Sequence, residues 1–216
     1  MPIITAFATS PDRGRGLARD MTVRWALEEV GLAYDVELLT FAEMKQERYL
    51  AHQPFGQIPT YQEGDLRLFE SGAIVLEIAR KHPGLLPHGP NSQARAIAWM
   101  FAAQATVEPN ITEFENACFF EQDRPWQQDH LALVECRLLK RLEQVADALA
   151  NREWLEGSFT AGDLMMVQVL RRIAGQAMLN SFPKLKSYME RAETRPAFER
   201  AYAAQAQIYR QMSRRT

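Results

Sequence analysis

The chain has 216 residues, of which 47% are hydrophobic and 24% are charged, and its formal net charge at pH 7 is −2. This is the composition of one large or two modest globular domains, and the weak negative charge argues against nucleic acid or an anionic membrane as a partner. Because there is no run of 18 apolar residues, no basic-then-apolar leader and only two cysteines (Cys118 and Cys136), we expect a cytoplasmic protein without a membrane span, a signal peptide or a disulfide scaffold.

The first 82 residues alternate between strand and helix patterns. An apolar face at three-to-four spacing predicts a helix from Leu17, and Gly31 is suited to end it. Residues 9–16 are rich in Pro, Asp and Gly and predict a loop. The other predicted elements are strands at 2–8, 34–39, 60–61 and 66–69, a short helix within 41–52 and a helix at 71–81. The predicted order is therefore β-α-β-(α)-β-β-α, an α+β domain.

Residues 83–90 contain three prolines and two glycines, which predicts a linker and a domain boundary. Every later pattern is helical. Thr160 and Asp163 have the spacing of a capping box ahead of a nearly all-apolar, buried helix. The other predicted helices cover 91–105, resuming after Pro109 to 120, then 129–150, 183–193 and 196–207. We therefore expect an α+β domain at 1–82, a linker at 83–90 and an all-α domain at 91–216.

Two neighbouring motifs suggest a binding site. Pro59 has no backbone N–H, so it favours a rigid turn at the start of a strand, and the Ile58–Pro59 bond is a candidate for the cis form. Such a turn leaves the amide and carbonyl of Ile58 available to a bound peptide. Glu70 and Ser71 open a helix, whose free N–H groups attract an anion. Together they indicate a site for a small peptide with carboxylate ends.

These motifs resemble those of the cytosolic glutathione S-transferases, and the resemblance covers essentially the whole chain. It implies a thioredoxin-like domain followed by a helical-bundle domain, in a two-fold homodimer. The resemblance is to the bacterial type, with a binding motif nearest the phi-, theta- and zeta-like classes. The two early motifs are the specific ones. The matching stretches are Phe55-Gly56-Gln57-Ile58-Pro59, Leu68-Phe69-Glu70-Ser71, the proline-rich linker, Thr160-x-x-Asp163, Phe182-Pro183-x-Leu185-x-x-Tyr188 and Arg195-Pro196-Ala197-Phe198.

The resemblance also implies roles for individual residues. Ile58, before a cis Pro59, would hold the cysteinyl backbone of glutathione, and Gln57 would add a hydrogen bond. Glu70 would face the γ-glutamyl ammonium and Ser71 its carboxylate, which suits a carboxylate side chain and a helix N-terminus respectively.

Lys45 stands where some classes bind the glycyl carboxylate with a His-Lys pair. Met44 replaces the histidine and cannot donate a hydrogen bond. Taken alone, Lys45 would be an ordinary surface lysine and Gln57-Ile58-Pro59 only a turn; their order and spacing favour the glutathione interpretation.

The sequence leaves open which residue would activate the glutathione sulfur. A thiol of pKa about 8.5 needs a donor or a positive charge nearby to ionise at neutral pH. The family places a Tyr, Ser or Cys after the first strand, but the loop here has neither Tyr nor Cys, and the usual serine and cysteine positions fall near Leu17 and Arg19. The candidates are Ser10 (or Thr9) and Arg19, whose guanidinium would attract a thiolate.

The expected function is a detoxifying glutathione transferase that joins the glutathione thiolate to a small hydrophobic electrophile, with glutathione as co-substrate and no metal. The alternatives are a glutathione-dependent isomerase or peroxidase on the same fold, and a non-catalytic glutathione-fold binding or regulatory protein.

Overall fold

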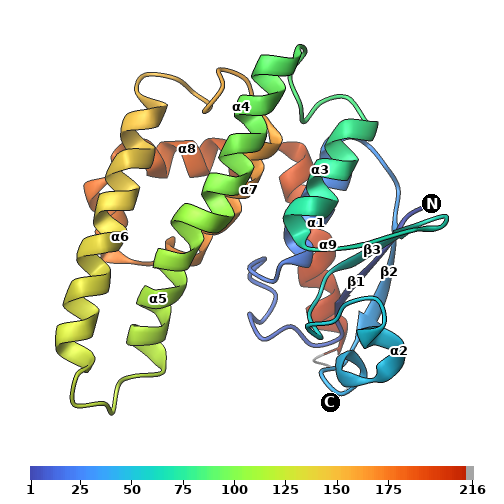
Figure 1. The fold of residues 1–216 in the computed structure, drawn as a ribbon, viewed down its shortest axis with the longest axis horizontal. Coiled ribbons are helices and arrows are strands. Elements are labelled where there is room, and N and C mark those ends of the chain that lie inside the picture. Colours follow the sequence, from blue (N-terminus) through green and yellow to red (C-terminus); the bar gives the residue numbers. More distant parts are fainter. Residues whose placement is uncertain (213–216) are drawn as a thin grey trace. The chain divides into compact units, whose positions relative to one another are not determined.

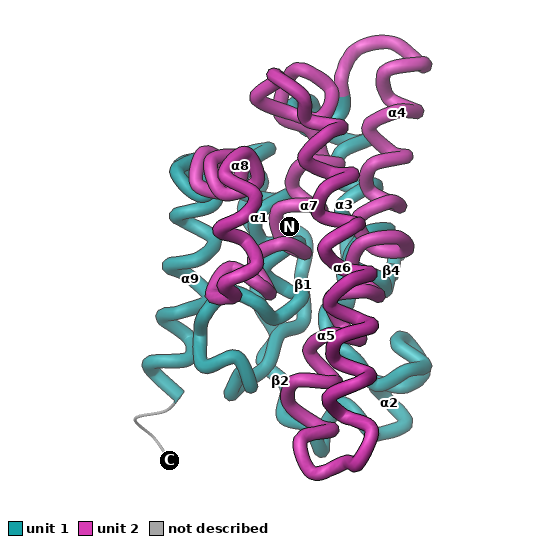
Figure 2. The backbone as a smooth tube through the Cα atoms, turned by 90° about the vertical axis from the view of Figure 1, so that its left-hand side faces the viewer, with its two compact units in different colours: residues 1–86, 193–216 teal, residues 87–192 magenta. Residues whose placement is uncertain are grey.

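A computed structural model describes residues 1–212. The described residues form two compact units, the first made of residues 1–86 together with residues 193–212, and the second of residues 87–192 (Figure 2). The sequence pattern puts all residues after 90 into one domain, whereas packing groups the last helix with the first unit. The reason is tertiary: this helix buries its apolar face on the first helix of the chain.

The first unit contains a four-stranded mixed sheet (Figure 1). β1 pairs in parallel with the edge strand β2, with Ile3 opposite Asp35 and Phe7 opposite Leu39. β3 runs antiparallel to β1 and to β4, so the strand order is β2-β1-β3-β4. The strands are β1 (Ile3–Phe7), β2 (Asp35–Leu39), β3 (Thr60–Glu63) and β4 (Leu66–Phe69), which confirms the four predicted strands.

Helices cover both faces of this sheet. Its first face, with Ile4 and Tyr61 paired and buried, packs against α1 and α3. The second face carries Thr5 and Phe7 and is covered in part by α2 (Figure 1). The helices of this unit are α1 (Asp20–Glu29), the short turn η1 (Glu43–Lys45), α2 (Glu47–Leu50), α3 (Ser71–Lys81) and α9 (Pro196–Met212).

The two ends of α1 have different causes. Gly31 adopts φ 67°, and the amide of Leu32 donates to the carbonyl of Leu27 at 2.9 Å, so the glycine ends the helix as predicted. The start differs: α1 begins at Asp20 rather than Leu17. The amides of Leu17 and Ala18 donate to the side chain of Asp12, and this holds residues 17–19 in the loop.

α9 is fastened to α1 by aromatic and ionic contacts. The rings of Trp25 and Phe198 meet edge-on at 5.0 Å. Arg195 donates two hydrogen bonds to Glu29, at 2.6 and 2.7 Å. A bidentate arginine–carboxylate pair fixes direction as well as distance, so α9 has a defined orientation on α1.

The second unit is helical throughout, as predicted. Gly162 lets two of its helices approach closely, because a Cβ there would lie 2.6 Å from Trp99 Cβ and 2.8 Å from the Ala96 carbonyl oxygen. The predicted capping box is confirmed, with the Thr160 amide donating to Asp163 at 2.9 Å. The elements are α4 (Pro90–Phe101), the π-helical η2 (Ala102–Val107), α5 (Glu108–Phe119), α6 (Gln127–Leu149), α7 (Ala161–Leu170), η3 (Arg171–Ile173), η4 (Ala177–Ser181) and α8 (Pro183–Glu193).

The predicted break near Pro109 takes the form of a π-helical segment rather than an interruption. Proline lacks an N–H and its ring collides with the carbonyl four residues earlier. The wider turns of residues 102–107 come directly before it and keep the chain helical. Across residues 1–212, no helix combines the length and the apolar character needed to cross a membrane.

Candidate functional site

The Ile58–Pro59 peptide bond is cis, as the sequence suggested. The Ile58 side chain is buried in a cluster with Leu39, Met44 and Tyr49. Within residues 1–212 the main-chain N–H and C=O of Ile58 have no hydrogen-bond partner. The side chain therefore anchors the turn to the core, while its main chain retains one donor and one acceptor for a ligand.

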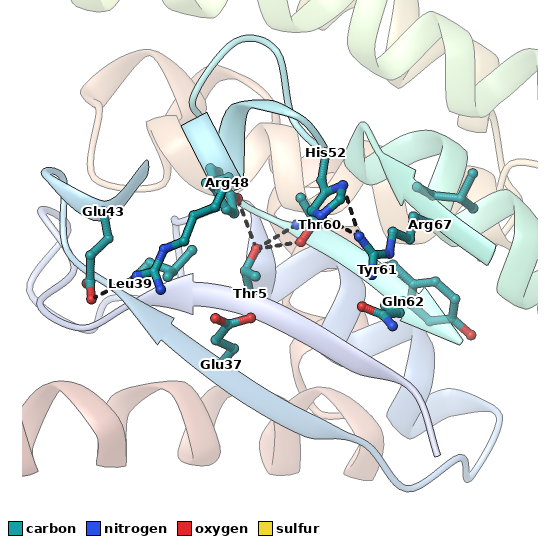
Figure 3. Close-up of a pocket in the computed structure, with 12 residues that line it drawn as sticks. Thr5, Glu37, Leu39, Glu43, Arg48, His52, Thr60, Tyr61, Gln62 and Arg67 are labelled. Carbon is teal, nitrogen blue, oxygen red and sulfur yellow. Dashed lines mark hydrogen bonds and ion pairs between the residues drawn. The ribbon is translucent and has the colours of Figure 1, made fainter. Parts of the chain in front are cut away.

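A chain of hydroxyl groups holds this turn, and Figure 3 labels two of its members, Thr5 and Thr60. Tyr49 donates to the carbonyl of Gln57 at 2.6 Å, and its oxygen lies 3.1 Å from Thr5 Oγ1. The Thr60 amide donates to Thr5 Oγ1 at 2.7 Å, and the Thr60 hydroxyl lies 3.1 Å from the same atom. Since the single Tyr49 proton goes to Gln57, Thr5 donates to Tyr49 and Thr60 donates to Thr5. The residues on both sides of the cis bond are thus tied to β1.

Sequence reasoning missed Thr5 and Tyr49. The only signal was a threonine inside an otherwise apolar strand. Burial raises the pKa of Tyr49, against the opposing effects of the Thr5 hydroxyl, which donates to it, and of the neighbouring Thr60 hydroxyl. Tyr49 therefore keeps its proton at neutral pH and remains a donor to Gln57.

A cavity of about 290 Å³ lies on the same face of the sheet, lined by residues of all four strands and of the segment 43–52 (Figure 3). Arg48 faces Glu43 at 3.8 Å at one end, and Arg67 contacts the ring of His52 at the other. The predicted glutathione-binding residues are not in its lining. The lining consists of Thr5, Glu37, Leu39, Glu43, Arg48, Tyr49, His52, Thr60, Tyr61, Gln62, Arg67 and Leu68.

Glu70 and Ser71 form the junction between β4 and α3. Glu70 is exposed and has φ 68° and ψ 113°, a left-handed conformation that costs a residue with a side chain about 1–3 kcal/mol and occurs mainly at functional sites. Ser71 is buried as the first residue of α3. The first turn of α3 carries no acidic side chain, whereas the preceding N-cap residue, Glu70, does. No carboxylate within the first turn itself therefore opposes the positive potential of the helix N-terminus.

Packing contacts bring the predicted binding segments together. Gly56 has φ 62°, and a Cβ there would lie 3.1 Å from the Met44 carbonyl oxygen, so the residues before the cis turn touch the segment that holds Lys45. Met44 is buried and Lys45 is exposed. The rings of Phe55 and Phe69 meet at 6.1 Å, which places this same turn beside Glu70.

The loop before α1 is organised by Asp12, which sequence reasoning missed. Its carboxylate accepts hydrogen bonds from Ser10 Oγ at 2.6 Å and from the amides of Gly14, Leu17 and Ala18 at 2.9, 2.6 and 3.1 Å. Burial acts to raise the pKa of Asp12, but these hydrogen bonds outweigh it and hold the pKa below the ordinary value. An Asp two residues before a Gly in a loop was the available signal.

The two predicted sulfur-activating residues differ in their surroundings. Ser10 is 7% exposed, and its single proton is donated to Asp12. Arg19 is exposed and directly precedes α1. The roles of Ser10 and Arg19 stay predictions.

The arrangement in the first unit is that of a peptide-binding site: an open main-chain donor and acceptor at a cis-proline turn, beside a helix N-terminus and an exposed carboxylate. Comparison with known proteins defines the class. Residues 13–80 match the glutathione S-transferase N-terminal domain, and residues 111–205 match the glutathione S-transferase C-terminal domain.

A probable glutathione S-transferase of Oryza sativa subsp. japonica is 30% identical over 91% of this chain and 94% of its own. A glutathione transferase from Populus trichocarpa superposes with a TM-score of 0.79 at 25% identity, covering 95% of this chain and 99% of its own. A family member from Pseudomonas fluorescens, solved with two glutathione molecules bound, has a TM-score of 0.81 at 23% identity, covering 93% and 92%.

The chain belongs to the glutathione S-transferase family. Its first unit carries the thioredoxin-like sheet and its second the helical portion, which confirms the predicted fold class.

Proposed function

We propose that the protein is a glutathione transferase. The glutathione thiolate attacks an electrophilic carbon of a small hydrophobic substrate and forms a C–S bond. In substitution the leaving group departs with its electron pair, and in conjugate addition the resulting carbanion takes a proton. The observation that carries the proposal is the unpartnered main chain of Ile58 at the cis turn, beside the N-terminus of α3.

Each end of glutathione then has a partner. The Ile58 N–H and C=O pair with the cysteinyl residue as an antiparallel strand would, and Gln57 adds a hydrogen bond. Ser71 and the α3 N-terminus take the γ-glutamyl carboxylate, Glu70 takes the ammonium and Lys45 the glycyl carboxylate.

We further propose that the protein is a cytoplasmic homodimer. Two unbridged cysteines, Cys118 and Cys136, support the cytoplasmic location. The exposed rings of Phe55 (65%) and Phe69 (36%) also give the first unit an apolar surface suited to a second copy.

A second candidate is a glutathione-binding protein without turnover. The observation that favours it is that the Asp12 carboxylate accepts hydrogen bonds from the Ser10 hydroxyl and from backbone amides of the loop. A protein of this kind would bind glutathione normally and leave its thiol largely protonated.

The test uses Glu70→Gln, because glutamine fills the same strained backbone position without the charge. Glu143→Gln, at an exposed position within α6, is the matched control. We expect wild type and the control to bind immobilised glutathione and to conjugate a chlorodinitrobenzene-type electrophile. Glu70→Gln should raise the glutathione KM about tenfold, the value of one charge-assisted hydrogen bond. Binding without conjugation would select the second candidate, and wild-type failure to bind would refute both.

A further inference from the structure

The start of α1 and the last helix meet at a buried polar cluster in the first unit. Asp20 and Arg24 are each 1% exposed, and Gln205 of α9 is 4% exposed. Arg24 Nε donates to one Asp20 oxygen at 2.7 Å, and Gln205 Nε2 donates to the other at 2.8 Å. The ion pair is internal to α1, so Gln205 is what links this buried charge to α9.

Two atoms of this cluster have no hydrogen-bond partner in residues 1–212: Arg24 Nη2, a donor, and Gln205 Oε1, an acceptor. A buried polar group without a partner costs about 1–3 kcal/mol, and such groups are rare in native proteins. One unsatisfied donor and one unsatisfied acceptor on adjacent side chains point to a small molecule that can serve both.

A cavity of about 10 Å³ lies at this position, lined by Asp20, Arg24 and Gln205 together with Ser10 of the loop. This volume corresponds to one water molecule. Ser10 Oγ gives its proton to Asp12, so its oxygen can accept another hydrogen bond. A water here would accept from Arg24 and donate to Gln205 and to Ser10, the three bonds typical of a buried water.

α9 also touches the loop directly. Gly14 has φ 72°, and a Cβ there would lie 3.1 Å from Tyr209 Cβ. Gly14 donates its amide to Asp12, which in turn holds the amides of Leu17 and Ala18. The loop is therefore held together internally by hydrogen bonds to Asp12, and it packs against α9.

We propose that Gln205 is a positioning residue for loop 9–18, acting through Asp20 and through one buried water held by Arg24, Gln205 and Ser10. The inference rests on the proposed function where it concerns catalysis, because this loop leads to the helix start at which the glutathione sulfur is expected. The last helix of the chain thereby sets the geometry of the loop before the first.

The test compares Gln205→Leu with Gln207→Leu, which makes the same chemical change at an exposed position of α9. Tyr209→Ala is the second variant, since it leaves the buried charges paired and removes the ring, whose Cγ and Cδ1 would each lie 3.3 Å from a Cβ at Gly14. Amide hydrogen exchange at Leu17 and Ala18 is measured in glutathione-free protein. We expect exchange at least about tenfold faster in Gln205→Leu and Tyr209→Ala, and unchanged in Gln207→Leu.

Turnover provides a second readout. In Gln205→Leu we expect kcat to fall about tenfold while the glutathione Kd changes less than about twofold, because misplacing the loop affects the sulfur and not the groups at Ile58 and Glu70. Unchanged exchange in Gln205→Leu would overturn the proposal, whatever Tyr209→Ala shows. Faster exchange in a protein that never binds glutathione would refute the proposed function and leave the positioning role of Gln205 intact. A high-resolution crystal structure that shows no water between Arg24 Nη2 and Gln205 Oε1 would refute the part of the proposal that concerns the buried water.

Discussion

The Ser10 hydroxyl donates to the Asp12 carboxylate at 2.6 Å, so the one proton that Ser10 could offer a thiolate is already committed inside the loop. The same carboxylate collects three backbone amides. The loop therefore contains an anionic carboxylate, that of Asp12, at the place where a transferase needs to stabilise the thiolate of glutathione.

Removing that anion should make stability depend differently on pH. In Asp12→Asn we expect the free energy of unfolding to fall by about 2 kcal/mol at pH 7, because hydrogen bonds to a charged acceptor are lost. The folded-state pKa of Asp12 lies below the ordinary value, so its contribution is complete above that value and disappears as pH falls through the folded pKa. The difference from wild type should therefore shrink below about pH 4.

Urea unfolding at a series of pH values measures this difference. Asp65→Asn, in the exposed turn between β3 and β4, is the control and should change stability little at any pH. A deficit in Asp12→Asn that persists undiminished in acid would show that the charge of Asp12 is irrelevant.

The choice between Ser10 and Arg19 can be made by turnover. We expect Ser10→Ala to lower kcat less than about threefold, because its proton is engaged by Asp12, and Arg19→Ala to lower it more than about tenfold. Conjugation rates at saturating glutathione measure both. Arg19→Lys, which keeps the charge, should restore part of the rate. The reverse ranking would identify Ser10 as the sulfur's partner.

The Tyr49 hydroxyl should matter for binding rather than for chemistry. Tyr49→Phe removes the donor to the Gln57 carbonyl and releases one side of the cis turn, so we expect a roughly three- to tenfold weaker glutathione Kd and a stability loss of about 1 kcal/mol. Calorimetric titration gives the Kd. Tyr202→Phe, at an exposed ring of α9, is the matched control. Equal affinities for the two variants would mean that the hydroxyl chain does not hold the turn.

Gly162 should tolerate no side chain. Gly162→Ala would push a Cβ to within 3 Å of Trp99 Cβ and of the Ala96 carbonyl oxygen, and overpacking of this kind costs about 1–3 kcal/mol. Thermal unfolding measures the loss. A Cβ at Gly175 would have nothing within 4 Å, so Gly175→Ala should be neutral or slightly stabilising. Similar melting temperatures for the two variants would contradict the close approach of α4 and α7.

Much of the fold follows from local signals that a single sequence displays. Gly31 ends α1 because a left-handed residue closes a helix, and Thr160 with Asp163 starts α7 because their side chains reach amides within three residues. The motif around Pro59 also marked its turn correctly, since proline restricts the backbone by its own ring. These features require no knowledge of the rest of the chain.

The tertiary structure alone decided which of these local elements contact one another. Thr5 and Tyr49 are hydrogen-bonded at a sequence separation of 44, and Asp20 and Gln205 at a separation of 185. No local sequence pattern identifies either pair. The grouping of α9 with the first unit and the closure of the loop around Asp12 depend on the same kind of contact. Short-range backbone preferences are encoded residue by residue, whereas the pairing of buried polar groups is settled only when packing removes them from water and leaves each to find its partner.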